Sequence, residues 1–186
     1  MLTIDKLIAR GRGLAPALLR RATQLELDWL TRQKSRFDAT DSAGRALDIK
    51  LPPGSVLRGG DVLVAEDGSL LKVNAAAQPV LVIKACAEHG SPLDLLRAAY
   101  HLGQHHVAIE LQPDHLKIEL DQALAGMLQR MHLIVSAEQA AFEPEGGAEQ
   151  VASGHDHGHS HSQSHGHAHE DHHDHAAHEH GHHAHD

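Results

Sequence analysis

The chain has 186 residues, of which 41% are hydrophobic, with a formal net charge of -9 at pH 7 and a single cysteine. This length allows one or two small domains and a tail, and one cysteine excludes a framework of disulfides within the chain. The lack of a basic surplus argues against nucleic acid as a partner, because phosphate binding requires lysine and arginine.

The negative charge is concentrated toward the C-terminus. No lysine or arginine follows Arg130, and the nine acidic residues from Glu143 to Asp186 supply the whole excess. The N-terminus lacks the basic region and apolar run of a signal peptide, and the longest apolar stretches are too short to span a membrane. We therefore expect a cytoplasmic protein with no membrane or nucleic-acid partner.

The first 75 residues have the pattern of short β-strands. Their strand-like segments are separated by turn residues and cover residues 23–28, 36–40, 45–51, 62–66 and 70–73. Asp67-Gly68 between the last two segments is the strongest hairpin signal in the chain. We expect a β-rich domain over residues 1–75, built as a small barrel or sandwich.

Residues 76–142 have a different rhythm, in which strands alternate with helices. Ser91 as N-cap and Pro92 at the first position predict a helix that stops at Gly103, and Asp121 caps a second one. The predicted strands cover residues 80–86, 106–111, 115–120 and 133–136. This β-α-β-β-α-β order is the ferredoxin-like arrangement, so the predicted fold class is α+β.

The segment from 143 to 186 is rich in histidine and poor in apolar residues. Because it cannot offset the entropy of its own ordering, we expect a disordered tail. Imidazole is the commonest metal-binding side chain, and alternating His-X-His lets neighbouring rings bind one ion. The candidate metal ligands here are His155, His157, His159, His161, His165, His167, His169, His172, His173, His175, His178, His180, His182, His183 and His185.

These tail histidines predict the binding of nickel, zinc or copper. Affinity among divalent ions follows the Irving–Williams order, so the tail alone does not select nickel over copper. A purification tag is the alternative interpretation, but a tag is normally an uninterrupted run, and this segment is interspersed with Asp, Glu and Gly.

A second histidine cluster lies in the folded part, at His101, His105 and His106. We expect His105 and His106 on an extended segment, with their side chains on opposite faces. One surface histidine is a poor metal site, but a two-fold axis pairs it with the same residue of a second chain. The alternatives are a helix C-terminus stabilised by His101 and a solvated His105.

The remaining candidates have ordinary explanations. Cys86 closes a predicted buried strand, where a buried and inert thiol is the favoured interpretation over a metal ligand. His89, His115 and His132 are isolated in sequence and are expected to be solvated or hydrogen-bonded. No motif of a hydrolase, zinc protease or redox enzyme occurs, so we expect no enzymatic activity.

Residues 86–107 resemble the signature region of the UreE family of urease accessory proteins. Residues 100–106 read Tyr-His-Leu-Gly-Gln-His-His, where that family typically has Tyr-His-Leu-Gly-Asn-Arg-His. Residues 124–128 match the family's Leu-x-x-Met-Leu helix. The domain order and the histidine-rich extension carry the resemblance over essentially the whole chain.

This resemblance implies a nickel metallochaperone. It implies a peptide-binding-like first domain over residues 1–75, a ferredoxin-like dimerisation domain over 76–142 and a metal-binding tail over 143–186. His106 would be the metal ligand at a homodimer interface, with His101 nearby. Ni(II) would be the cargo, with Zn(II) or Cu(II) as competitors, and the GTPase UreG and the urease activation complex would be the partners.

Two departures from the family pattern bear on the site. Gln104-His105 replaces Asn-Arg, which makes His105 an additional candidate ligand. Some relatives carry His-x-His before the second helix, whereas this chain has Leu120-Asp121-Gln122, so we expect no secondary site there.

Three other functions remain open from the sequence. A cytoplasmic nickel or zinc store would use the same tail without an interface site. A hydrolytic metalloenzyme would use His101, His105 and His106 as ligands but lacks a nearby acidic base. A peptide-binding chaperone would rest on the β-rich first half and leaves the tail unexplained.

Overall fold

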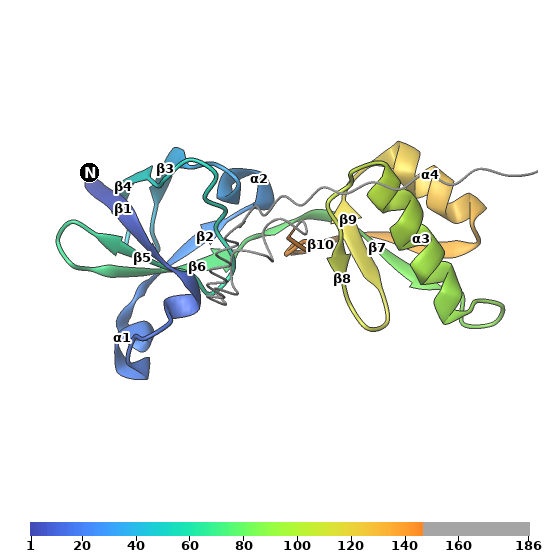
Figure 1. Cartoon of the computed structure of the whole chain (residues 1–186), viewed down its shortest axis with the longest axis horizontal. Coiled ribbons are helices and arrows are strands. Elements are labelled where there is room, and N and C mark those ends of the chain that lie inside the picture. Colours follow the sequence, from blue (N-terminus) through green and yellow to red (C-terminus); the bar gives the residue numbers. More distant parts are fainter. Residues whose placement is uncertain (147–186) are drawn as a thin grey trace, which may run out of the picture. The chain divides into compact units, whose positions relative to one another are not determined.

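The computed structural model describes residues 1–146 as a mixed α+β structure dominated by strands (Figure 1). This confirms the predicted class, while the predicted disorder of the histidine-rich tail falls mainly on residues 147–186, outside the described part. The elements are β1 (Leu2–Ile8), η1 (Ala9–Gly11), α1 (Pro16–Arg21), β2 (Thr23–Leu27), α2 (Trp29–Arg32), β3 (Arg36–Thr40), β4 (Ala46–Lys50), β5 (Val62–Ala65), β6 (Leu70–Ala75), β7 (Ala77–Ala85), α3 (Pro92–Gln104), β8 (Glu110–Leu111), β9 (Leu116–Glu119), α4 (Gln122–Arg130) and β10 (Leu133–Ala141).

The first sheet has six strands in the order β2-β6-β5-β1-β4-β3. The predicted hairpins β3–β4 and β5–β6 are both antiparallel, as expected. Gly68 has φ of 80°, which the turn between β5 and β6 requires and which glycine adopts without steric cost. β1 pairs with β4 and β2 with β6 in parallel, so the sheet is mixed.

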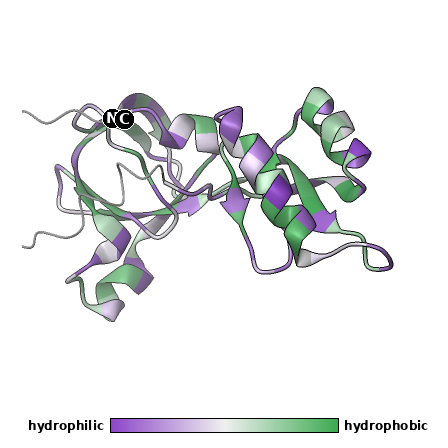
Figure 2. Cartoon of the chain, turned by 45° about the vertical axis from the view of Figure 1, so that its right-hand side comes forward, coloured by the Kyte–Doolittle hydropathy of each residue, from purple (hydrophilic) through white to green (hydrophobic). Residues whose placement is uncertain are grey.

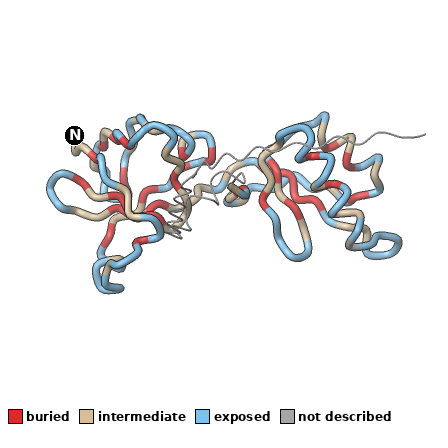
Figure 3. The backbone as a smooth tube through the Cα atoms, viewed as in Figure 1, coloured by how far each residue is buried: buried red, intermediate tan, exposed pale blue. Residues whose placement is uncertain are grey.

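One apolar core unites the two ends of this sheet. Leu25 and Leu27 of β2 belong to the same buried cluster as Leu47 and Ile49 of β4, although the two strands are far apart in the sheet order. The sheet therefore curves around a single core, and the buried residues lie along its strands (Figure 3). The β-rich character predicted for this region is confirmed.

The second sheet has four strands in the order β10-β7-β9-β8, all antiparallel. With α3 after β7 and α4 after β9, the chain follows the predicted β-α-β-β-α-β order. Leu81 and Ile83 of β7 face a core completed by Leu102 of α3 and Leu128 of α4.

The central strand β7 is buried on both faces, which explains its continuous apolar run. Val80 and Val82, which point away from the helices, belong to a separate buried cluster with Trp29 and Phe142. Trp29 N also donates to Gln78 Oε1 at 2.7 Å.

The two helices beside the second sheet, α3 and α4, begin where the sequence predicts. At α3, Ser91 and Asp94 form a reciprocal capping box, and at α4 the Asp121 carboxylate accepts a hydrogen bond from Leu124 N at 2.9 Å. Both hydrophobic and hydrophilic residues occur along the helices, as in an amphipathic helix that packs one side against the core (Figure 2). Among the described helices, none has both the length and the apolar character to cross a membrane.

Candidate metal centre

The histidine cluster lies at the C-terminal end of α3. Ala98 and Leu102 of this helix are buried, and they pack against β7 and α4. The opposite face leaves Leu93, Leu96 and Tyr100 exposed. Because residues three and four apart share one side of a helix, these three side chains form an apolar stripe on the surface.

The helix ends in a Schellman motif, with His106 at the position that glycine usually occupies. Val107 N donates to Leu102 O at 3.1 Å, and His106 N donates to Gly103 O at 3.0 Å. His106 therefore has φ of 54°, in the left-handed region. These bonds satisfy the last carbonyls of the helix, and they leave the His106 side chain exposed at its tip.

This geometry corrects the expectation for residues 104–111. The helix continues through Gln104 instead of stopping at Gly103, and His105 is its C-cap with φ of -87°. The strand predicted over residues 106–111 is limited to Glu110–Leu111. His105 and His106 thus close a helix and do not lie on an extended segment, so the expected alternation of faces was wrong.

His101 lies in the last turn of α3 and is exposed like the other two histidines. Its ring meets that of Tyr100 edge-on, with centroids 5.5 Å apart. Gln104 Nε2 in turn donates to the Tyr100 hydroxyl oxygen at 2.7 Å. A polar tip and an apolar stripe therefore adjoin at this end of the helix.

Glu110 anchors the chain shortly after the cluster, a role that its position in a predicted strand did not reveal. Its buried carboxylate accepts hydrogen bonds from Glu143 N at 2.7 Å and pairs with Lys117 Nζ at 2.6 Å. Burial raises the pKa of this carboxyl, but the hydrogen bonds from Glu143, Lys117 and Gln112 outweigh it and the net direction is down.

The other histidines and the cysteine occupy two further places. His115 Nδ1 lies 2.7 Å from an Asp114 carboxylate oxygen, as expected for a hydrogen-bonded surface residue. His89 Nδ1 lies 4.0 Å from Cys86 Sγ. Cys86 is only partly buried, so the expectation of a buried thiol was wrong.

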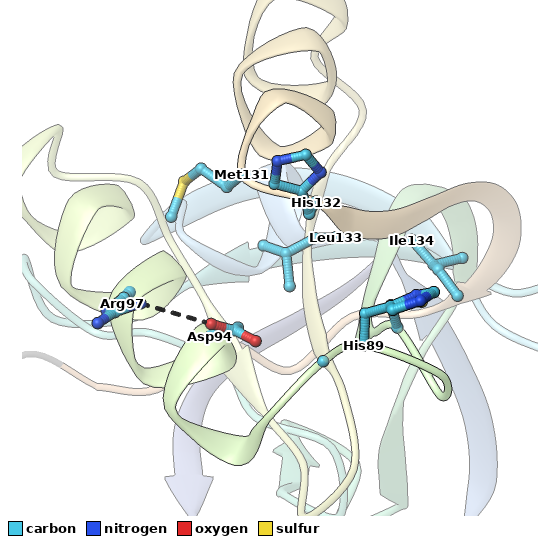
Figure 4. Close-up of a pocket in the computed structure, with 9 residues that line it drawn as sticks. His89, Asp94, Arg97, Met131, His132, Leu133 and Ile134 are labelled. Atoms are coloured by element: carbon cyan, nitrogen blue, oxygen red, sulfur yellow. Dashed lines mark hydrogen bonds and ion pairs between the residues drawn. The ribbon is translucent and has the colours of Figure 1, made fainter.

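The environment of Cys86 favours the thiolate. Hydrogen bonds from the backbone N–H groups of His89 and Glu88, followed by the His89 side chain, lower the pKa of Cys86 to about 7. Cys86 and His89 line a cavity together with His132, at the end of α4, and its lining is shown in Figure 4.

Within residues 1–146, no group of three or more histidine, cysteine or acidic side chains is close enough together to hold a metal ion. The structure brings His101, His105 and His106 to one helix end without closing them on a common point. The fifteen histidines predicted as tail ligands lie outside the described residues.

Two family models match this chain in succession. The model described as UreE urease accessory protein, N-terminal domain, covers residues 4–76, and its C-terminal domain counterpart covers residues 78–170. The chain belongs to the UreE family of urease accessory proteins. The second match begins at the second residue of β7 and includes the rest of the β-α-β-β-α-β unit and the histidine cluster.

Individual relatives agree with this assignment. The urease accessory protein UreE of Methylibium petroleiphilum is 68% identical over 155 residues, which cover 83% of this chain and 71% of the relative. That of Verminephrobacter eiseniae is 66% identical, over 85% of this chain and 94% of the relative. The protein of Cupriavidus necator, also named urease accessory protein UreE, is 47% identical over 86% of this chain and 80% of its own length. The UreE family is accessory rather than catalytic, which agrees with the expectation of a non-enzyme.

Proposed function

We propose that this chain is a metallochaperone that binds Ni(II) and delivers it to apo-urease during assembly of the urease metallocentre. Membership of the UreE family supports the role in urease maturation. The abundance of histidine, 21 of 186 residues, supports metal as the cargo. Zn(II) and Cu(II) would compete with nickel for the same imidazoles.

The observation that carries the proposal is the position of His106. It is an exposed imidazole at the tip of α3, held in a left-handed conformation that a glycine would adopt more easily. Observed backbone strain of this kind is concentrated at functional sites. One imidazole is a weak ligand, but a homodimer would place His106 of both copies at a shared site.

The apolar stripe on α3 supports an interface beside that site. Leu93, Leu96 and Tyr100 have 50%, 66% and 64% of their surfaces exposed, which is costly for three large side chains on one helix face. A second copy of the chain covering this stripe would bring the two helix ends together. His101 and His105 are then the next candidate ligands.

The tail would collect metal for the interface. Its fifteen histidines are covalently tethered to the body, so an ion held there is at high effective concentration near His106. We propose a division of labour between a β-rich domain over 1–75, a metal-binding and dimerising domain over 76–142, and a metal-collecting tail over 143–186.

Delivery would proceed by ligand exchange in the cytoplasm. An ion held by a pair of imidazoles keeps open coordination positions, which an acceptor protein can fill before the donor lets go. This requires no catalytic acid or base. The acceptors in this proposal are the accessory GTPase UreG and the urease activation complex.

Calorimetric titration of Ni(II) into the metal-free full chain tests the central residue, with the oligomer mass measured in parallel. We expect one tight site per two chains and many weaker ones. His106→Ala should remove the tight site and leave the weaker ones, whereas the control His115→Ala should change neither. A tight site that survives His106→Ala would exclude His106 as the centre.

A nickel or zinc store is the alternative, and a chain ending at Gly147 separates the two. This chain keeps the compact unit Met1–Gly147 and loses every tail histidine. A delivery protein retains its tight site and supports urease activation in a reconstituted assay at sufficient nickel. A store would lose all metal binding with the tail.

A further inference from the structure

The loop between β7 and α3 folds back so that His89 approaches Cys86. Gly90 N donates to Cys86 O at 2.7 Å, which closes a tight turn. A Cβ atom at residue 90 would lie 2.6 Å from Cys86 N and still closer to Cys86 O, so only glycine fits. This close approach sets the separation of Cys86 Sγ and His89 Nδ1 at 4.0 Å.

That separation suits two ligands of one ion. A first-row metal with bonds of about 2.3 Å to sulfur and about 2.0 Å to nitrogen would hold the two atoms about 3.5 Å apart in a tetrahedral site and about 4.3 Å apart in a linear one. The observed 4.0 Å lies between these values. The distance between Cys86 Sγ and His89 Nδ1 is therefore compatible with one metal ion bound to both atoms.

The pair opens onto a cavity of about 680 Å³ between three segments of the chain. The β7–α3 loop provides Cys86 and His89, and the start of α3 provides Asp94, which pairs with Arg97 at 3.6 Å. The end of α4 provides His132. Figure 4 shows His89 and His132 at this cavity, with the Asp94–Arg97 pair beside them.

His132 repeats the geometry of His106 at the other helix. It follows the C-cap of α4, has φ of 62°, and donates its N–H to Gln129 O at 3.0 Å. Histidine therefore takes the usual glycine position at the end of both helices of this unit. The His132 side chain is exposed and lines the same cavity as Cys86 and His89.

We propose that Cys86 and His89, completed by His132 or by water, form a second metal site for a thiophilic cation, Zn(II) or Cu(I). A thiolate selects these softer ions over Ni(II) better than imidazoles alone do. In residues 1–146 no three ligands are already assembled, so the site is a two-ligand pair that closes when the ion binds. It is separate in sequence from His106 and does not depend on the proposed nickel delivery.

Cys86 is the only cysteine in the chain, so any thiol signal from the full-length protein reports on this site alone. The experiment measures the rate at which iodoacetamide alkylates Cys86 while Zn(II) is added. Addition continues until an indicator shows free Zn(II), which ensures that the tail histidines are saturated. We expect the bound ion to block alkylation, because the coordinated thiolate is no longer a free nucleophile.

Variants assign the ligands. Replacing a residue that only hydrogen-bonds to a metal ligand typically weakens metal binding 10- to 100-fold. His89→Ala removes a ligand itself. We therefore expect the Zn(II) concentration that protects half of Cys86 from alkylation to rise at least about 100-fold. His132→Asn, which tolerates the left-handed backbone, should raise it by about 10-fold. The control His115→Asn should leave it unchanged. Thermal unfolding by circular dichroism checks that each variant is folded.

Two further measurements separate the ions and test the sulfur directly. Cu(I) under anaerobic reducing conditions should protect Cys86 as Zn(II) does, whereas Ni(II) should protect it only at higher concentration. Co(II) in place of Zn(II) should give a sulfur-to-metal charge-transfer band that Cys86→Ser abolishes.

Full reactivity of Cys86 in the presence of free Zn(II), or equal protection of the wild type and His89→Ala, would overturn the proposal. Equal protection of the wild type and His132→Asn would remove His132 from it.

Discussion

Arg32 Nη1 and Glu143 Oε1 lie 2.6 Å apart and form a partly buried ion pair that joins α2 to the segment after β10. The Arg32 side chain is completely buried, while that of Glu143 is 33% exposed. Burial lowers the pKa of the Arg32 guanidinium, and the Glu143 carboxylate opposes that shift. Arg32 also donates to the carbonyl oxygens of Leu27 and Phe142.

The pair belongs to a cluster that holds the segment after β10 against α2. Trp29 stacks under the guanidinium of Arg32, with 5.2 Å from Cζ to the ring centroid, and its ring meets that of Phe142 edge-on at 6.3 Å. Glu143 Oε1 also accepts a hydrogen bond from Gly59 N at 2.9 Å. The chain is therefore anchored at Glu143, close to the end of the described residues.

Removing the Glu143 carboxylate should destabilise the fold. Glu143→Ala leaves the buried Arg32 charge without its partner, and we expect a loss of about 3 kcal/mol in the free energy of unfolding. Urea unfolding of the metal-free chain, followed by Trp29 fluorescence, measures it.

Two control variants show whether the charge of Glu143 or its hydrogen bonds stabilise the fold. Glu143→Gln retains an acceptor for Arg32 and Gly59 and should cost less than the alanine variant. Glu145→Ala removes a nearby exposed carboxylate and should cost little. If the Glu143 and Glu145 alanine variants unfolded at the same urea concentration, the pair would have no stabilising role.

Relief of the backbone strain at His106 should stabilise the metal-free protein. A left-handed conformation costs a residue with a Cβ roughly 1–2 kcal/mol and glycine much less, so His106→Gly should raise the free energy of unfolding by about 1 kcal/mol. His106→Ala keeps the strain and should give no such gain. Urea unfolding without metal compares the two.

The matched position at α4 separates stability from nickel binding. His132→Gly should give a similar gain, because His132 has a nearly identical φ. Only the His106 variants should lose the tight nickel site in calorimetry. If His132→Gly removed that site as well, the two helix ends would act together and the proposed centre would need revision.

The candidate site shows where sequence reasoning succeeds and where it stops. The starts of α3 and α4 were predicted because Ser91 and Asp121 form hydrogen bonds within a few residues and Pro92 has a φ that suits the first helical position. The end of α3 was placed one residue early and His106 on a strand, because a glycine within the last turn is the usual stop signal, whereas here a histidine takes the left-handed position. The presence of a histidine at position 106 does not by itself predict a left-handed backbone conformation.

In the fold, strands joined by a tight turn were predicted from the sequence, whereas pairing between distant segments was not. The β5–β6 hairpin was predicted from Asp67-Gly68, since a tight turn fixes its own register. β1 was missed, because it pairs in parallel with β4, some forty positions away, and such pairing leaves no local turn signal. The approach of His89 to Cys86 was missed as well, because it depends on the turn that Gly90 permits.

Acid should weaken the β3–β4 hairpin through Asp41. Burial raises the pKa of its carboxyl, but hydrogen bonds from Arg45, Thr23 and Ala43 outweigh it and hold the pKa below 3.8. A carboxyl with a lowered pKa stabilises the fold above its unfolded pKa, and that contribution is lost as the pH falls through the folded value. Asp41→Asn should therefore cost about 1–3 kcal/mol at pH 7 and progressively less below pH 3.8.

Urea unfolding at a series of pH values measures the difference between the wild type and Asp41→Asn. The control is Asp38→Asn, an exposed carboxylate in β3. A gap between wild type and Asp41→Asn that stayed constant down to pH 2 would contradict a titrating Asp41.

The thiol of Cys86 should titrate near neutral pH in the folded chain. Its pKa is lowered from 9.0 to about 7, chiefly by the backbone N–H of His89, then by that of Glu88 and by the His89 side chain. Since only the thiolate reacts, the alkylation rate of the metal-free chain should rise through pH 7 and level off above it. Unfolding in urea should move this midpoint upward, toward the ordinary value of 9.0. His89→Ala removes the imidazole but keeps the backbone N–H, so it should shift the midpoint upward by less than unfolding does. A midpoint equal to that of the unfolded chain would mean that the imidazole, and not the turn held by Gly90, activates the thiol.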